Sequence, residues 1–348
     1  MVNYCDEYWQ DVKLVSEQIP NLKHLFGSSV LISGATGMIC SSVTEILLYL
    51  NKMQDAHIQI ILAGRSRERI KERFYCFEDG NDYIFIPYDA TSSNPIDIKS
   101  DFIIHGASNA DPGKFAIEPV ETMLANIIGL NALLKSAIDN KAKRLLYISS
   151  SEVYGRKNER RPYRESDYGF VDILNPRASY PSSKRAAETL CSAYSAEYGL
   201  DTVIVRPGHI YGPTITESDS RASAQFTRKA KAGENIIMKS AGIQLRSYCY
   251  TLDCASAILT VLINGKCGDA YNISNSKSIV TIREMAEALA QVGGLKIIFE
   301  NPSVLEQKSY NMMDNSSLDS KKLEMIGWSA ISNMKDGALK TLKYYITE

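Results

Sequence analysis

Strongly apolar runs alternate with helical patterns along the chain from Val30 onward. The runs that predict strands are VLIS at 30–33, IQIILA at 58–63, YIFIPY at 83–88, FIIHGA at 102–107, RLLYIS at 144–149 and TVIVRP at 202–207. Because these runs have no polar face, the strands are expected to be buried on both sides, as in a parallel sheet covered by helices. Helical patterns lie between them, the longest at 117–139 and 178–198. The alternation predicts an α/β fold with a doubly wound parallel sheet.

The rest of the chain is arranged around this predicted sheet. Residues 1–28 are expected to form a helical lead-in, and a Rossmann domain is expected to span 29–207. After residue 208 the alternation loosens into a loop-rich region with helical pieces, including a helix at 281–292 that opens with the capping-box pair Thr281 and Glu284. Without a Pro- or Ser-rich linker, the parts are expected to interleave. The chain then returns to the Rossmann domain near 245–275, and a smaller C-terminal lobe, formed by 208–244 and 276–348, binds the substrate.

Composition narrows the class of function. The 348 residues carry 39 Lys+Arg against 40 Asp+Glu, a net charge of −1, which argues against nucleic acid or an anionic membrane as a partner. Neither an apolar stretch of about 20 residues nor a signal-peptide pattern is present, so we expect a cytoplasmic protein. The seven cysteines are scattered without a C-x-x-C pair, which indicates neither a disulfide framework nor a metal site.

The segment SGATGMIC at 33–40 follows the first predicted strand and opens a helix. Gly34 and Gly37 allow a tight turn and a close approach of the backbone to a pyrophosphate at the helix N-terminus. The strand, turn and helix together predict dinucleotide binding. The end of the second strand, AGRSRER at 63–69, lacks the acidic residue that bonds the ribose of NAD. Arg65 and Arg67 favour NADP over NAD, the alternative being that they form the solvated first turn of a helix.

Tyr180 and Lys184 are spaced Y-x-x-x-K, which puts both side chains on one face of a helix. A lysine ammonium beside the phenol and the cofactor is expected to lower the phenol pKa, so that the tyrosine acts as an acid or base near neutral pH. The alternative is a pair of surface residues on an amphipathic helix. YISSSEVYG at 147–155 supports the catalytic interpretation, because a serine cluster there follows a buried strand at the carboxyl edge of the sheet.

With these motifs the chain resembles the extended short-chain dehydrogenase/reductases, and among them the nucleotide-sugar-modifying members of the NAD-dependent epimerase/dehydratase family. The resemblance covers nearly all of the chain after residue 28. Besides the segments above, it rests on Asp89 in IPYDAT, HGASNADP at 105–112, NIIGLNALL at 126–134, RPGHIYGP at 206–213 and RSYCYTLDCASAI at 246–258. The chain departs from the family pattern at Cys40, which replaces a glycine, and at His209, which replaces an asparagine.

The resemblance implies a role for each matching residue. Ser150 bonds the reacting oxygen of the sugar, Tyr180 transfers its proton, and Lys184 holds the nicotinamide ribose. The expected NAD(P) contacts are Gly34, Thr36, Gly37, Met38, Ile39, Arg65, Asp89, Ala90, Ala107, Asn126, Tyr180 and Lys184. The expected contacts to a nucleoside-diphosphate sugar are Ser108, Ser150, His209 and Arg246. Family members dimerise through a four-helix bundle, which implies a homodimer built from the helices near 117–139 and 178–198.

The reaction subclass depends on Ser151 and Glu152, which follow Ser150. The family's 4,6-dehydratases carry aspartate and glutamate there, whereas Ser, Ser, Glu resembles the nucleotide-uronate decarboxylases, so Ser151 and Glu152 join the expected catalytic residues. A 4-epimerase, a 4,6-dehydratase and an NADPH-dependent 4-ketoreductase are the alternatives, and the last agrees best with NADP. A non-catalytic NADP-binding sensor is a more remote alternative, and a local cap or salt bridge is the alternative role of Glu152.

Overall fold

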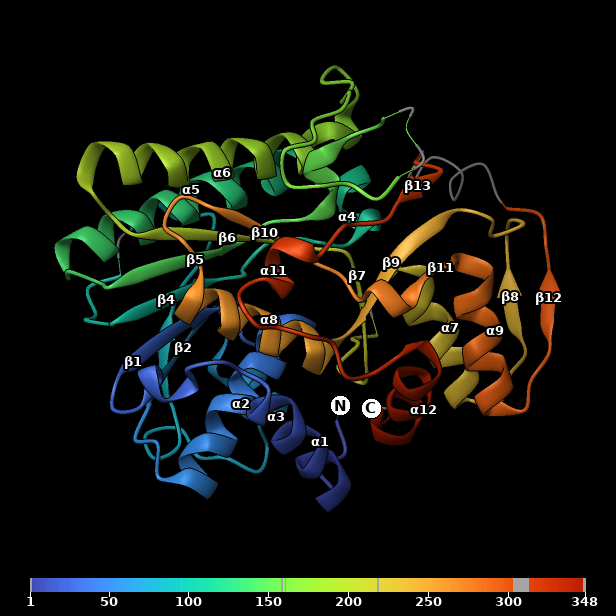
Figure 1. Cartoon of the computed structure of the whole chain (residues 1–348), viewed down its shortest axis with the longest axis horizontal. Helices are drawn as coiled ribbons and strands as arrows, with labels where there is room; N and C mark the ends of the chain where they lie inside the picture. Colours follow the sequence, from blue (N-terminus) through green and yellow to red (C-terminus); the bar gives the residue numbers. More distant parts are fainter. Residues whose placement is uncertain are drawn as a thin grey trace.

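The computed structural model describes residues 2–94, 96–157, 159, 161–217, 219–302 and 313–346. Its centre is a seven-stranded sheet in which all neighbouring strands are parallel (Figure 1). In spatial order the strands are β10 (Ala270–Ile273), β6 (Thr202–Pro207), β5 (Arg144–Ile148), β4 (Phe102–His105), β1 (Ser29–Ser33), β2 (Gln59–Gly64) and β3 (Ile84–Pro87). The order 3-2-1-4-5-6, extended by β10, is that of a doubly wound Rossmann sheet, which confirms the predicted fold class.

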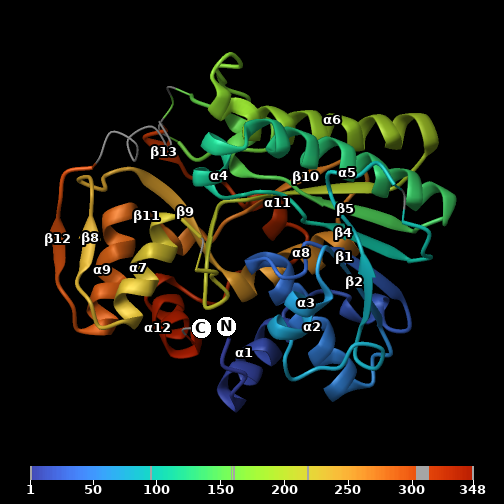
Figure 2. The ribbon, with the colours of Figure 1, turned by 180° about the vertical axis from the view of Figure 1, so that it is seen from behind.

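Helices cover both faces of the sheet, because successive strand side chains point to opposite sides. Val30 and Ile32 of β1 pack into one core, and Leu31 packs into the other. The first core is covered by α1 (Asp6–Glu17), α2 (Met38–Gln54), α3 (Arg67–Arg73) and α8 (Thr251–Asn264). The second is covered by α5 (Pro119–Asp139) and α6 (Ser179–Tyr198), which lie side by side as an outer layer (Figure 2). Each predicted strand and both long helices are present.

The C-terminal lobe contains two small sheets that the sequence analysis did not predict. One joins β7 (His209–Tyr211), β9 (Leu245–Tyr250), β11 (Ile279–Thr281) and β13 (Asn315–Ser316), and the other pairs β8 (Ile236–Met238) with β12 (Ile297–Phe299). The expectation that the chain after residue 208 forms loops and helical pieces is therefore wrong in part, because it also forms strands. Apart from β9, these strands have only two or three residues, too few to give a periodic pattern, and they are defined by long-range pairing instead.

Helices α7 (Ala222–Lys231), α9 (Ile282–Gly293) and α12 (Met334–Tyr344) pack together in this lobe, α11 (Lys321–Glu324) packs against β10, and the short α4 (Pro112–Ile117) precedes α5. Single turns of 3₁₀ helix lie at Leu22–Leu25, Ser151–Tyr154, Pro176–Ala178 and Ser276–Ser278. The capping box predicted for α9 is present, with the Thr281 hydroxyl accepting from the Glu284 amide at 3.1 Å. None of the described helices combines the length and apolar character needed to cross a bilayer.

Candidate active site

The turn between β1 and α2 has the geometry of a dinucleotide-binding loop. Gly34 has a φ of +74°, and a Cβ there would lie 2.8 Å from the backbone nitrogen of Ala107, so only glycine fits. The following helix α2 starts at Met38 without a side-chain cap and without an acidic residue in its first turn. Its first amides are therefore free to bind a pyrophosphate. Thr36 and Ile39 are half-buried along the same turn, and Gly37 is exposed.

A pocket of about 660 Å³ lies beyond the ends of β2 and β3. Its lining includes Arg65, Tyr88 and Asp89. The Asp89 carboxylate accepts hydrogen bonds from the Thr91 amide at 2.9 Å and hydroxyl at 2.8 Å. These bonds, with a smaller contribution from Arg65, lower the pKa of Asp89 and keep it ionised. The pocket thus presents one cation, Arg65, and two carboxylates, Asp89 and Asp97.

Arg67 does not line this pocket with Arg65. Its guanidinium forms an ion pair with Asp79 at 2.8 Å and lies over the Phe85 ring, 5.0 Å from the centroid. The expectation that both arginines serve the cofactor therefore retains support from geometry only for Arg65. The sequence could not reveal this, because Asp79 and Phe85 reach Arg67 through tertiary packing.

Three buried polar atoms without hydrogen-bond partners lie at or just after the ends of β3 and β4. In the part of the chain that the structure describes, the buried Tyr88 hydroxyl, His105 Nε2 and Ser108 hydroxyl have no hydrogen-bond partner. Buried polar atoms without partners are costly, and a bound polar ligand relieves that cost. These unpartnered atoms, the Gly34 turn and the start of α2, which has no side-chain cap, are together consistent with binding of a dinucleotide.

Asn126, one of the expected cofactor contacts, is fully buried and bonded within the protein. Its amide nitrogen donates to the Thr122 carbonyl at 2.9 Å and to the Ser183 hydroxyl at 3.1 Å. Its amide oxygen accepts from the Tyr147 hydroxyl at 3.4 Å. The side chain therefore ties α5 to α6 below the site. Ala90 packs against α5 near Gly129, where a Cβ would lie 2.5 Å from the Ala90 carbonyl.

The expected catalytic group assembles where β5 ends and α6 begins. The Ser150 hydroxyl accepts from the Glu152 amide at 3.2 Å and also hydrogen-bonds Tyr180. Lys184 lies one helical turn after Tyr180 and donates to the Ile148 carbonyl at 2.8 Å, with its ammonium 5.7 Å from the Tyr180 ring centroid. Ser150, Tyr180 and Lys184 are thus brought together as the sequence predicts. Ser151 is buried in the turn between Ser150 and Glu152.

The electrostatics of this group differ from the expectation. Burial raises the pKa of Tyr180 to about 12, and the hydrogen bond with Ser150 opposes this rise only in part. Burial also lowers the pKa of Lys184 to about 7. The lowered phenol pKa, predicted for Tyr180 beside both Lys184 and the cofactor, is therefore not found in the protein alone. The reason is that desolvation penalises the phenolate and the ammonium alike, and it exceeds the attraction of nearby positive charges.

Glu152 does not stand free in the site. Its carboxylate forms a two-bond ion pair with Arg177, in which each guanidinium Nη lies 3.0 Å from one carboxylate oxygen. Glu152 still contributes to the electrostatic environment of both Tyr180 and Arg246. Glu152 therefore forms a local salt bridge and also lies beside the catalytic group.

His209 and Arg246, two of the residues expected to contact the substrate, lie in the small sheet of the C-terminal lobe. Arg246 on β9 is 3 % exposed, and its guanidinium donates to the Leu245 carbonyl at 2.9 Å. His209 opens β7 instead of lying in a loop, and its Nδ1 is buried without a partner among the described residues. Burial, with smaller contributions from Arg246 and Arg221, lowers the pKa of His209 to about 3, so the ring is neutral. An arginine and a neutral histidine thus face one region.

Three residues that the sequence analysis missed complete the site. Arg177 binds Glu152 and precedes Tyr180 by three residues, a proximity in the sequence that could have pointed to it. Arg221 lies within electrostatic range of Tyr180 and is paired with Asp219 at 2.5 Å. Phe115 stacks on Tyr180 with ring centroids 4.3 Å apart and an interplanar angle of 11°. No pattern marks Arg221 or Phe115, because only tertiary packing brings them to the site.

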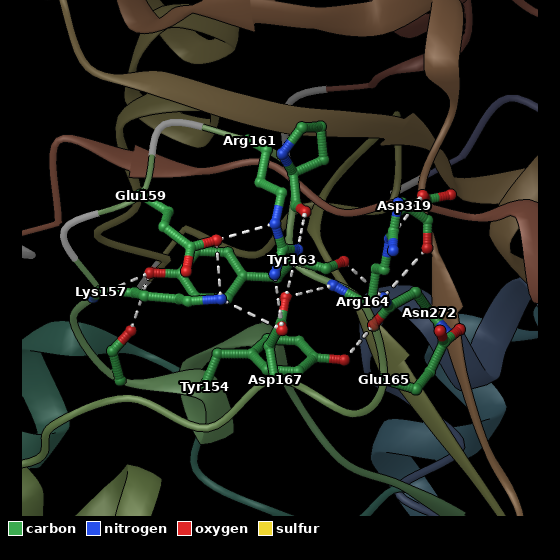
Figure 3. A network of polar contacts seen from close by, with 12 residues as sticks. Tyr154, Lys157, Glu159, Arg161, Tyr163, Arg164, Glu165, Asp167, Asn272 and Asp319 are labelled. Carbon is green, nitrogen blue, oxygen red and sulfur yellow. Dashed lines mark hydrogen bonds and ion pairs between the residues drawn. The ribbon is translucent and has the colours of Figure 1, made fainter.

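The segment after the site is anchored to the central sheet by a polar network (Figure 3). The Asp167 carboxylate accepts from Lys157 at 3.1 Å and from Arg161 at 2.7 Å. The Tyr154 hydroxyl donates to the Asn272 amide oxygen at 2.5 Å, which joins this segment to β10. The network fixes the region that carries Glu152 relative to the sheet. Among the described residues, no group of three or more His, Cys, Asp or Glu side chains is placed to hold a metal ion.

Comparison with known proteins identifies the family. The family model described as the NAD dependent epimerase/dehydratase family matches residues 30–274. The chain belongs to the NAD dependent epimerase/dehydratase family. The predicted membership is thus confirmed, and the match begins at β1, so α1 lies outside it.

Similar members of the family span its reaction classes. UDP-glucuronic acid decarboxylase 1 of Xenopus tropicalis is 29 % identical over 323 residues, covering 92 % of this chain and 72 % of that protein. The solved UDP-glucose 4-epimerase of Thermotoga maritima, with UDP-glucose, has a TM-score of 0.75 at 20 % identity, covering 91 % of this chain and 98 % of that one. The dTDP-glucose 4,6-dehydratase of Streptomyces venezuelae, solved with NAD bound, has a TM-score of 0.76 at 22 % identity, covering 90 % and 96 %. Both structures confirm the fold, and the predicted enzyme class, a nucleotide-sugar-modifying member of an NAD-dependent family, agrees with these relatives.

Proposed function

We propose that this chain decarboxylates a nucleoside-diphosphate uronate, in the manner of a UDP-glucuronate decarboxylase. The observation that carries the proposal is Glu152, which lies beside Ser150 and Tyr180 and within electrostatic range of Arg246. Ser151 stands where a dehydratase of this family carries aspartate, so the acid needed to expel a hydroxyl group is missing. The similarity to UDP-glucuronic acid decarboxylases supports the same reaction.

The residues that would hold NAD(P) are the Gly34 turn, the first turn of α2, the pocket with Arg65 and Asp89, and Lys184. When bound, NAD(P) supplies the hydride acceptor and donor for carbon 4 of the sugar. We propose that Tyr180 takes the proton of the carbon 4 hydroxyl and later returns it, while Ser150 donates a hydrogen bond to the same oxygen. The raised pKa of Tyr180 favours the neutral phenol, which is the form that returns the proton.

A ketone at carbon 4 makes the uronate a β-keto acid. The bond between carbons 5 and 6 then breaks, carbon dioxide leaves, and the electron pair remains on the sugar as an enolate that takes a proton at carbon 5. We assign the acid and base function near carbon 5 to Glu152. Arg246, which is buried and bonded only to a backbone carbonyl in the described structure, would bind the diphosphate, with His209 beside the sugar.

An NADPH-dependent 4-ketoreductase is the second candidate, and Arg65 favours it. A guanidinium in the adenosine pocket suits the 2′-phosphate of NADP, and a net reduction consumes NADPH in each turnover. NAD binding is known for relatives, and the preference of this chain for NADP is part of our proposal.

The deciding experiment has two arms. Any dinucleotide released on denaturation is identified by mass spectrometry, and UDP-, dTDP-, CDP- and GDP-sugars are tested with and without NADPH. Release of carbon dioxide from a uronate without added cofactor supports decarboxylation. Consumption of NADPH only with a 4-keto sugar would contradict decarboxylation and support the 4-ketoreductase. Glu152→Gln should reduce decarboxylation by roughly a hundredfold or more, while the exposed Glu197→Gln leaves it unchanged.

We further propose a cytoplasmic homodimer that associates through α5 and α6. The outward side of α5 exposes Val120 by 61 %, Met123 by 38 % and Leu124 by 42 %, and the adjacent side of α6 carries the small residues Ala186 and Ala193. Apolar helix faces with small neighbours allow two pairs of helices to pack closely as a four-helix bundle.

A further inference from the structure

The Arg177–Glu152 ion pair has a geometry that fixes the carboxylate. Both Nη atoms lie 3.0 Å from separate carboxylate oxygens, which is the fork arrangement that only arginine can form. Arg177 is itself held, because the Asn175 side chain caps its backbone amide at 3.0 Å at the start of a 3₁₀ turn. The orientation of Glu152 in the site is therefore determined by a residue outside its own turn.

Arg177 also connects this pair to the catalytic tyrosine. Its guanidinium lies 6.0 Å from the centroid of Phe115, and Phe115 stacks on Tyr180. The Ser150 hydroxyl closes the arrangement, since it bonds both Tyr180 and the Glu152 amide. The chain of contacts therefore links Arg177, Glu152, Ser150 and Tyr180 around one position, where the sugar would react.

The charge of the pair matters for a substrate that carries its own carboxylate. An unpaired Glu152 would repel a uronate, because like charges at close range in a buried site disfavour each other strongly. Arg177 offsets the charge of Glu152, and its Nε is buried without a hydrogen-bond partner in the described part of the chain. A neutral hexose would not experience this repulsion.

We propose that Arg177 is a positioning residue that orients Glu152 and, by neutralising it, allows the site to bind nucleotide sugars with a carboxylate at carbon 6. The proposal deepens the function proposed above and rests on it for the reaction, although its binding test does not depend on turnover. Arg177 is assigned no proton transfer.

The test compares UDP-glucuronate with UDP-glucose, which differ at carbon 6, or the same pair on another base if the panel above selects one. Calorimetric binding to Arg177→Gln should weaken about tenfold for the uronate and less than twofold for the hexose. In a Glu152→Gln background the same Arg177→Gln change should cost less than twofold for either sugar. Equal losses for both sugars, or an undiminished loss in the Glu152→Gln background, would overturn this role in uronate binding.

The conservative variant separates positioning from charge. Arg177→Lys retains the charge and should bind the uronate within about threefold of wild type, yet lower kcat by roughly tenfold or more, because a single ammonium does not fix the carboxylate. Wild-type kcat in Arg177→Lys would disprove the positioning role. Arg144→Lys is the matched control, since Arg144 makes a comparable two-bond pair with Asp201 away from the site. If uronate binding follows these expectations but no carbon dioxide is released, the reaction proposed above fails and the role of Arg177 in uronate binding stands.

Discussion

Tyr344 in the last helix donates a 2.8 Å hydrogen bond to Asp11 in the first helix. Lys340 forms an ion pair with the same carboxylate at 2.9 Å, and the Asn3 amide donates to the Tyr344 carbonyl at 2.8 Å. On its other side α1 reaches α2, where the Tyr8 hydroxyl donates to the buried Glu45 at 2.5 Å. The N-terminal helix therefore braces the Rossmann domain against the C-terminal lobe, and the two ends of the chain lie together (Figure 1).

Asp11→Ala should destabilise the protein by about 1–3 kcal/mol, because it leaves the buried Tyr344 hydroxyl and the Lys340 ammonium without their partner. Urea unfolding measures the loss, and kcat should stay within twofold. Asp6→Ala, an exposed change in the same helix, is the control. A stability equal to wild type would show that α1 does not brace the two parts.

Tyr180→Phe should lower turnover by roughly a thousandfold, since the phenol that exchanges the proton of the sugar hydroxyl is removed. Binding of NAD(P) and of the nucleotide sugar should be preserved, because Phe retains the stacking on Phe115. Tyr198→Phe in the same helix, where the tyrosine is 56 % exposed, should behave as wild type. Near-normal activity of Tyr180→Phe would remove the acid and base role.

Lys184→Met should abolish turnover and yet stabilise the protein. Burial lowers the pKa of Lys184 from 10.5 to about 7, so between these values the unfolded state binds more protons than the folded state. Wild-type stability therefore rises with pH across that window, and the cost of burying the lysine is largest below pH 7. The lowering of the pKa from 10.5 to about 7 corresponds to about 5 kcal/mol at pH 6, so the gain there should approach this size, less the lost hydrogen bond to the Ile148 carbonyl, and should shrink toward pH 10.

Unfolding curves of wild type and Lys184→Met, recorded from pH 6 to 10, measure this difference, with the exposed Lys71→Met as the control. A gain that is absent at pH 6, or that grows with pH, would contradict the depressed lysine pKa.

Arg65→Ala should weaken binding of NADP by about tenfold and leave binding of NAD nearly unchanged, because only NADP carries the 2′-phosphate. Arg67→Ala should leave the ratio of the two affinities unaltered, since Arg67 is paired with Asp79. Fluorescence titration with both dinucleotides gives the ratio directly. Equal weakening of NAD and NADP by Arg65→Ala would assign Arg65 to the adenosine rather than to a phosphate.

Leu124→Glu should convert the proposed homodimer to monomers, because two charges would be buried in the helix bundle. Sedimentation at micromolar concentration tests this change. Met325→Glu alters a side chain that is 79 % exposed and lies outside α5 and α6, so it should leave the dimer intact. Sedimentation of the wild-type protein as a monomer would contradict the proposed interface of α5 and α6.

The sequence by itself determined the features that depend on local patterns. The strands of the central sheet are continuous apolar runs, as burial on both faces requires, and Val30 to Ser33 illustrates this in β1. Gly34 is needed for a backbone conformation that other residues rarely adopt, and the spacing of Tyr180 and Lys184 follows from one turn of helix. These constraints act within a few residues, so they can be read along the chain.

The tertiary structure alone decided which partners the functional groups meet. Arg67 is paired with Asp79, Glu152 is held by Arg177, and His209 starts a strand beside Arg246, none of which is encoded within a local window. The raised pKa of Tyr180 likewise reflects how completely distant segments exclude water from it. Pairing, burial and charge neutralisation depend on the three-dimensional proximity of residues far apart in the chain, and that proximity sets the chemistry available to the site.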